Sequence, residues 1–248
     1  MPSDSDGTID ESQSVTLRGP SVSLAAHHDS SPPLMLMAPA ERQQRVEREP
    51  KPVPLGPAGH FTQEPRIAVQ TSVPALLIPT TALNFDGVGN GFSGPAGSFT
   101  VNSAPPDTNG DVGPNHYVQT VNTDFAIFNK SGTAVFGPVP INTLWSGFGG
   151  GCQTNNDGDP TVVYDPIADR WVISQFSVNT TPFLQCVAVS QTADPTGSYF
   201  RYSFNYGNTD FPDYPKLGVW PDAYYTTFNI FAHGSTFSGA RSCAYDRA

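Results

Sequence analysis

The sequence predicts an all-β domain behind a disordered N-terminal tail, and three observations support this. The composition changes near residue 75, since of the 3 Trp, 9 Tyr and 16 Phe only Phe61 precedes that point. The chain after residue 75 has no Glu and few Lys, Leu and Met, so it lacks the strongest helix formers. Its apolar residues alternate in short aromatic and β-branched runs broken by Gly, Pro, Asn and Asp, which is typical of strands and turns.

Residues 1–75 are predicted to be a disordered tail or linker. Ser, Pro, Gln and charged residues dominate there, so little apolar surface offsets the conformational entropy of the chain. An alternative interpretation is a remnant export signal, because residues 33–40 are apolar and end on Ala38-Pro39-Ala40, which resembles a cleavage site. This apolar run is short and begins late for a signal.

Residues 76–248 are predicted to form strands with almost no helix, and three segments within them resemble one another. Each has Asn or Asp, one further residue, and then an aromatic residue; a small hydroxyl residue follows three positions after the aromatic. The aromatics are Tyr117, Trp171 and Tyr224, and the hydroxyl residues are Thr120, Ser174 and Thr227. The aromatic spacings are 54 and 53 residues.

A period of about 53 residues made of short antiparallel strands is typical of β-propeller blades, which bury their faces only against neighbouring blades. The sequence therefore predicts a partial β-propeller, with a β-sandwich as the alternative. Because a propeller has roughly four to eight blades, residues 76–248 hold only about three. We expect the remaining blades to come from chain outside this sequence, and the last strand to be exposed and unpaired.

The three cysteines are Cys152, Cys186 and Cys243. Cys152 lies in a Gly-rich loop and Cys186 in a predicted strand of the same repeat, so a disulfide between them is predicted; three buried thiols are the alternative. The partner of Cys243 is then expected beyond Ala248. A disulfide indicates an oxidising compartment, outside the cell or in its envelope.

Charge and hydropathy exclude two classes of partner. The chain has 12 Lys and Arg against 22 Asp and Glu, a formal net charge of -10. This balance argues against a nucleic-acid-binding surface, which would be basic. No stretch approaches the roughly 20 apolar residues of a membrane-spanning helix.

Three longer motifs resemble those of a group of secreted bacterial propeller-like proteins with no established activity. They are Pro105-Pro-Asp-Thr-Asn-Gly-Asp-Val-Gly-Pro-Asn-His-Tyr-Val-Gln119, Asn156-Asp-Gly-Asp-Pro160 with Ala168-Asp-Arg-Trp171, and Asp213-Tyr-Pro-Lys-Leu-Gly-Val-Trp-Pro-Asp222. The resemblance covers about residues 83–248. It implies an exported propeller, and members of the group are longer than this chain.

Acidic loops suggest a metal site. Oxygen-bearing side chains at alternate positions, as in residues 107–111, are typical of calcium loops, although this segment departs from the EF-hand pattern. A second cluster follows at 155–159. The predicted Ca²⁺ ligands are Asp107, Asn109, Asp111, Asp157 and Asp159. The alternative is that Asn-Gly and Asp-Gly simply form tight turns.

Three functions remain open from the sequence. The favoured hypothesis is a secreted or cell-surface binding module that recognises a glycan or protein through loops, with Trp145 and Trp220 as candidate ligand-binding aromatics. A hydrolase acting on glycans would use a carboxylate pair drawn from Asp111, Asp159 and Asp213. The third hypothesis is a structural scaffold without a ligand. Patterns of serine and zinc hydrolases are absent from the sequence, so a non-enzymatic role is favoured.

Overall fold

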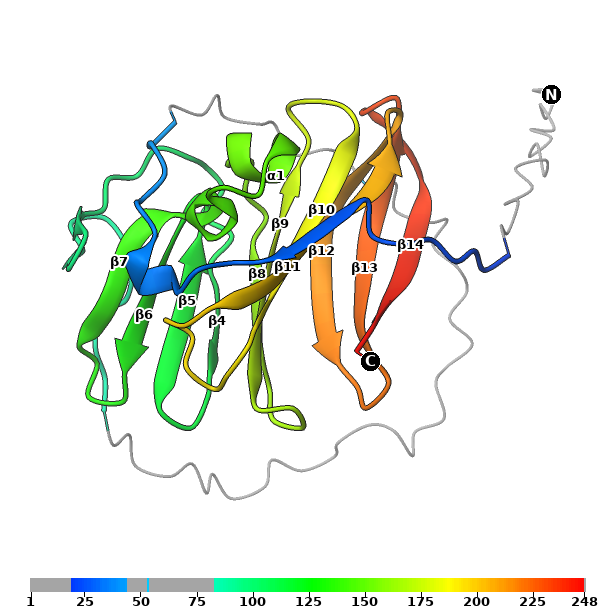
Figure 1. The fold of residues 1–248 in the computed structure, drawn as a ribbon. Helices are drawn as coiled ribbons and strands as arrows, with labels where there is room; N and C mark the ends of the chain where they lie inside the picture. The colour runs from blue at the N-terminus through cyan, green and yellow to red at the C-terminus, as the bar shows by residue number, and fades with distance from the viewer. Residues whose placement is uncertain (1–18, 44–52, 54–82, 248) are drawn as a thin grey trace, which may run out of the picture.

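The computed structural model describes residues 19–43, 53 and 83–247, and the chain in these ranges is mostly antiparallel β-structure (Figure 1). Its helices in the same ranges are short: η1 (Leu34–Leu36), η3 (Ile141–Trp145) and α1 (Gly150–Thr154). The predictions of an all-β fold and of almost no helix are confirmed.

Three sheets follow one another along the chain, each a meander of consecutive antiparallel strands. The first sheet holds β4 (Asn109–Val112), β5 (His116–Val121), β6 (Asp124–Asn129) and β7 (Ala134–Pro140). The second sheet holds β8 (Thr161–Asp165), β9 (Arg170–Ser177), β10 (Phe183–Ser190) and β11 (Tyr199–Gly207). The third sheet holds β12 (Asp210–Val219), β13 (Ala223–Ala232) and β14 (Thr236–Asp246).

The sheets lie in chain order across Figure 1, and the described strands leave them open rather than closed into a ring. The first strands are neighbours, since β4 contacts β8 and β8 contacts β12. The three similar segments of the sequence form β5, β9 and β13, the second strand of each sheet. A small hairpin of β2 (Ser93–Gly94) and β3 (Gly97–Ser98) lies against β7.

Apolar side chains on alternate strand positions bury the faces between the sheets. Val118 and Ile127 of the first sheet share one core with Trp171 and Ile173 of the second, and all four are fully buried. On its other face the second sheet packs against the third through a cluster that contains Val172. The fold therefore depends on contacts between consecutive sheets.

Asp165 shows how one acidic residue serves both a turn and a sheet interface. Its Oδ1 accepts hydrogen bonds from the amides of Ile167 and Ala168, at 2.8 and 3.1 Å, and so shapes the turn between β8 and β9. Its Oδ2 accepts the hydroxyl of Tyr224 at 2.9 Å and pairs with Arg247 at 2.8 Å. Burial, followed by this bond to Asp165, raises the pKa of Tyr224 to about 12, so the phenol remains a donor.

Residues 26–43 pack against the β domain, so the prediction of a disordered tail through residue 75 is wrong for this stretch. The strand β1 (His27–Ser30) pairs with β11 at the edge of the second sheet, and Leu34 is fully buried in the main core. Asp29 accepts both Nε and Nη2 of the buried Arg201, at 2.8 and 2.6 Å. In residues 19–25, Val22 and Leu24 are 99% and 91% exposed. The rest of the predicted tail, apart from Val53, lies outside the described residues.

Asp124 is a second anchor for this N-terminal segment. Its side chain is fully buried, and Arg42 pairs with it at 2.5 Å. Burial raises the pKa of Asp124 to about 6, although the Arg42 guanidinium acts to lower it.

The predicted disulfide is confirmed: Cys152 of α1 is bonded to Cys186 of β10. Cys243 is a free thiol on β14.

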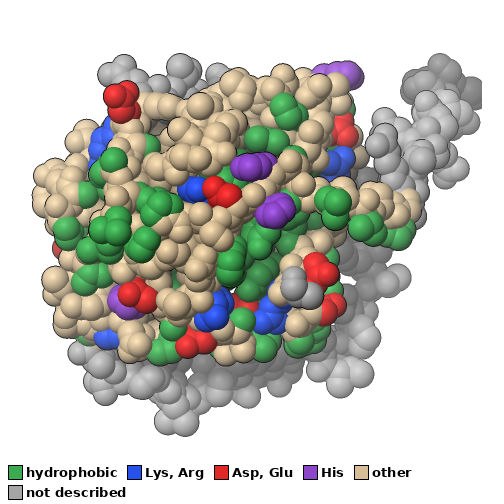
Figure 2. All heavy atoms as spheres, viewed as in Figure 1, with side chains coloured by type: hydrophobic (Ala, Val, Ile, Leu, Met, Phe, Trp, Pro, Cys, Tyr) green, Lys and Arg blue, Asp and Glu red, His purple; other side chains and the backbone are tan. Residues whose placement is uncertain are grey.

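No helix in the described ranges has the length and apolar character needed to cross a bilayer. Figure 2 shows acidic and basic side chains interspersed on the described part of one face, with neither sign dominating it.

Candidate functional site

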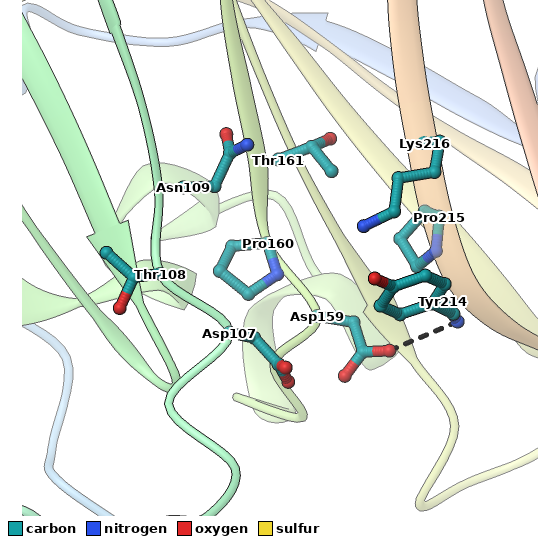
Figure 3. A pocket seen from close by; sticks show the side chains of 9 residues that line it. All are labelled: Asp107, Thr108, Asn109, Asp159, Pro160, Thr161, Tyr214, Pro215 and Lys216. Carbon is teal, nitrogen blue, oxygen red and sulfur yellow. Dashed lines mark hydrogen bonds between the residues drawn. The ribbon is translucent and has the colours of Figure 1, made fainter.

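The most distinctive site lies beside the first strands of the three sheets, where β4 and β8 begin and at the bulge within β12. A pocket of about 120 Å³ is lined by one tripeptide from each sheet: residues 107–109, 159–161 and 214–216 (Figure 3). These tripeptides occupy the same place in their sheets, because Asn109, Thr161 and Lys216 pair with Thr120, Ser174 and Thr227 respectively. The partners are the three hydroxyl residues that recur in the sequence.

The backbone around the pocket has an uncommon feature in all three tripeptides. Asp107, Asp159 and Tyr214 each begin a tripeptide, and each has a positive φ, of 38, 46 and 54°. This left-handed region is unfavourable for residues with a side chain, least so for Asp and most clearly for a bulky Tyr. Unfavourable backbone at three equivalent positions around one pocket suggests a functional constraint.

One buried amide joins the first two tripeptides. Asn122, 3% exposed, donates from Nδ2 to the Asp107 carboxylate and to the carbonyl of Pro105, the latter at 3.1 Å. Its Oδ1 accepts the backbone N–H of Asp159 at 2.9 Å. Asp159 in turn accepts the backbone N–H of Tyr214 at 3.2 Å (dashed in Figure 3). These bonds fix the three tripeptides relative to one another.

The chemistry of the lining is polar and mixed in charge. Two carboxylates, Asp107 and Asp159, share the pocket with the ammonium group of Lys216. The Lys216 Nζ lies 3.5 Å from the centroid of the Tyr214 ring, a cation–π contact. The site therefore offers hydrogen-bond acceptors, one flexible donor and an aromatic ring to a small polar ligand.

The predicted calcium segment 107–111 is mostly strand rather than loop, and the oxygen-bearing side chains at its alternate positions accept hydrogen bonds from a neighbouring strand. Asn109 and Asp111 lie on the same face of β4, directed at β8. Asn109 Oδ1 accepts the amide of Val162 at 2.7 Å, and Asp111 Oδ2 accepts the amide of Tyr164 at 2.8 Å. Because β8 is the edge of its sheet, these side chains satisfy amides that no neighbouring strand pairs.

The five predicted calcium ligands do not all meet at one point. Asp107, Asn109 and Asp159 line the pocket, whereas Asp111 contacts β8 and Asp157 accepts the amides of residues 178 and 179, at 2.6 and 2.8 Å. Within the described residues no group of three or more His, Cys, Asp or Glu side chains is placed to hold a metal ion. Calcium binding stays a prediction.

The remaining predicted site residues are placed as follows. Of the catalytic candidates, Asp159 lines the pocket, but Asp111 and Asp213 do not; the second carboxylate there is Asp107. Trp145 is fully buried, so the prediction that it binds ligand in an open loop is wrong. The reason is that its segment folds into η3, all of whose residues are buried in or against the core. Trp220 is 62% exposed and lies outside the pocket lining.

Sequence reasoning missed Asn122, Tyr214 and Lys216. A signal for the last two exists, because Asp159-Pro160 and Tyr214-Pro215 precede equivalent strand positions. The constant spacing of the aromatics hides this similarity, because the strands before them pair with different offsets. Trp171 pairs with Tyr164, seven positions before it, whereas Tyr224 pairs with Val219, five positions before it. The longer turn of the second sheet shifts its first strand by two residues.

Comparisons with protein-family models, with curated proteins and with solved structures find no match to this chain.

Proposed function

We propose that the chain is a binding module of the β-propeller type, acting outside the cell or in its envelope, and that it holds a polar glycan residue in the pocket between the three first strands. The observation that carries this proposal is the construction of that pocket from three register-equivalent tripeptides, each with a left-handed first residue. A scaffold without a ligand has no need of unfavourable backbone at these positions.

A sugar residue fits the chemistry of the lining. Carboxylates and an ammonium group can bond neighbouring hydroxyls, and an exposed tyrosine ring can stack on the apolar face of a sugar ring. Tyr214 is 54% exposed, and Asp107, Asp159 and Lys216 face the same small space. An extended apolar ligand would find few partners here.

The propeller arrangement is supported by the order of the strands. Each sheet is a meander, and the next sheet begins beside the first strand of the previous one. Propeller blades have this organisation, whereas a β-sandwich has two sheets with Greek-key connections. The disulfide is consistent with an exported protein.

The test is a glycan array followed by calorimetric titration of each bound glycan. Lys216→Ala and Asp159→Asn should each weaken binding at least about tenfold, since each removes one charged hydrogen bond. Asn tolerates left-handed backbone, so Asp159→Asn should fold normally. Lys130→Ala and Asp194→Asn, at residues outside the pocket lining, are the matched controls. Binding that is unaffected by the pocket variants would refute this assignment.

A hydrolase is the second candidate, because two carboxylates line one pocket, as glycoside hydrolysis requires. Turnover of chromogenic glycosides, lost in both Asp107→Asn and Asp159→Asn, would favour it over simple binding. Binding without turnover by the unmodified protein would favour the module.

A further inference from the structure

The chain contains three Asp–Pro peptide bonds, and one of them differs from the others in its backbone. The bonds join Asp159 to Pro160, Asp165 to Pro166 and Asp194 to Pro195. Asp159 has a φ of 46°, whereas Asp165 and Asp194 lie outside the left-handed region. The proline ring drives the residue before it towards extended backbone, with φ of about −120°. The Asp159–Pro160 junction therefore combines left-handed backbone with the crowding of a following proline.

Hydrogen bonds on both sides hold this junction in place. The N–H of Asp159 donates to Asn122 Oδ1 at 2.9 Å, and Asp159 Oδ2 accepts the N–H of Tyr214 at 3.2 Å. One residue beyond Pro160, the hydroxyl of Thr161 is hydrogen-bonded to that of Ser174 at 2.6 Å. Unfavourable backbone persists where the surrounding contacts over-determine it. The strain at this junction is therefore retained in the folded chain.

The carboxylates of the three aspartates also differ in their surroundings. Asp165 is fully buried, and its two oxygens serve the turn after β8, Tyr224 and Arg247. Asp194 Oδ1 accepts both the N–H and the hydroxyl of Thr196, at 2.9 and 2.8 Å. Asp159 is half-buried and lines the pocket of about 120 Å³, which has room for water (Figure 3). Strain, a neighbouring carboxyl group and access to water coincide at this bond.

We propose that the chain cleaves its own Asp159–Pro160 peptide bond. An oxygen of the Asp159 side-chain carboxyl attacks the carbonyl carbon of the same residue and closes a five-membered cyclic anhydride. The bond from that carbon to the Pro160 nitrogen breaks, and the carboxyl proton moves to this nitrogen, which leaves as a secondary amine. A water molecule in the pocket then opens the anhydride, so the net change is hydrolysis of the peptide bond. This self-processing is independent of the proposed function.

The structure supplies two reasons for this bond to react faster than an ordinary Asp–Pro bond. Strain that is present in the intact junction and relieved as the bond breaks lowers the barrier. The other charged side chains that line the pocket are Asp107 and Lys216, and the Lys216 ammonium group opposes the negative charge that develops on the attacked carbonyl oxygen. We expect the two effects together to give an acceleration of at least about tenfold.

The Cys152–Cys186 disulfide spans the cleavage site, because one cysteine precedes Asp159 and the other follows Pro160. The two products, residues 1–159 and 160–248, therefore remain covalently joined until the disulfide is reduced. Cleavage leaves a new α-carboxylate on Asp159 and a new amine on Pro160. Because both residues line the pocket, the reaction changes its charge and frees the Asp159 backbone from the following proline.

The experiment incubates the full chain in mildly acidic buffer, once folded, as verified by circular dichroism, and once in concentrated urea. Gel electrophoresis with and without reductant, followed by mass spectrometry, identifies the products and their rates of formation. The two products should separate only after reduction. In the folded chain the Asp159–Pro160 bond should be cut at least about tenfold faster than the other two Asp–Pro bonds, and at least about tenfold faster than the same bond in urea.

Three variants separate this reaction from other causes of cleavage. Asp159→Glu keeps the carboxylate but would need a six-membered ring, and Pro160→Ala removes the crowding by proline, so each should slow cleavage about tenfold or more. Asp194→Asn is the control and should leave the rate unchanged. An uncut folded chain, equal rates at the three bonds, or faster cleavage in urea would overturn the proposal without any variant. Cleavage of Asp159→Glu at the unmodified rate would indicate a contaminating protease and would also overturn it.

Discussion

The clearest test of the acidic strand β4 is a comparison of two substitutions at Asp111. Its carboxylate accepts the amide of Tyr164 at 2.8 Å and thereby joins the first sheet to the edge of the second. Asp111→Ala leaves that amide without its acceptor, and a hydrogen bond to a charged group is worth about 1.5–3 kcal/mol. Because the site is only partly buried, we expect a loss near 2 kcal/mol. Asp111→Asn keeps an oxygen in the same place and should cost less than about 1 kcal/mol.

The assay is urea unfolding of the full chain, with excess Ca²⁺ and with EDTA. We expect the stability losses of Asp111→Ala and Asp111→Asn to be the same with Ca²⁺ and with EDTA. A bound calcium ion at a hundred times its dissociation constant would add about 2.7 kcal/mol. A Ca²⁺-dependent gain in the unmodified protein that disappears in Asp111→Asn would refute the reasoning, as would an Asn variant no more stable than the Ala variant.

Three further predictions concern stability. Replacing Cys152 and Cys186 by Ser should cost about 4 kcal/mol, because the bond closes a 34-residue separation; a loss below about 1 kcal/mol would contradict this. Asp124 has a pKa of about 6 when folded against 3.8 as the ordinary value. The folded state therefore binds this proton more tightly, and stability contributed by Asp124 falls as pH rises from about 4 to 6. As the pH rises from about 4 to 6, the free energy of unfolding of Asp124→Asn should increase by about 3 kcal/mol relative to that of the unmodified protein. Urea unfolding at each pH measures this difference, and a difference that does not change with pH would contradict the prediction. Tyr214→Asn should leave the free energy of unfolding unchanged or raise it by up to about 1 kcal/mol, because Asn tolerates the left-handed backbone better than Tyr. Glycan titration should nevertheless show weaker binding, and a large loss of stability would contradict this prediction.

The sequence was informative wherever a local pattern decides the structure. Alternating aromatic and β-branched runs and the lack of helix formers were enough for the all-β fold, and the recurring hydroxyl residues marked the strands that pair beside the pocket. The Cys152–Cys186 bond could also be predicted from the sequence, because both residues belong to one predicted repeat.

Long-range contacts were not accessible in the same way. Asp29 pairs with Arg201, which lies 172 residues further on, so no local composition indicates that the N-terminal segment is ordered. Trp145 has a glycine-rich context that suggests an open loop, yet its burial depends on the opposing faces of two sheets. Asn109 and Asp111 have the alternation of metal ligands, but edge amides of another strand take their oxygens.

In the proposed function, three register-equivalent segments of the first strands form one ligand-binding pocket. An amide chemical-shift titration with a glycan selected from the array tests it most directly. We expect the largest chemical-shift changes to fall in all three segments, 107–109, 159–161 and 214–216, and Lys216→Ala to remove them together. Changes confined to one segment, or centred elsewhere, such as the cavity beside His27 and Phe148, would contradict it.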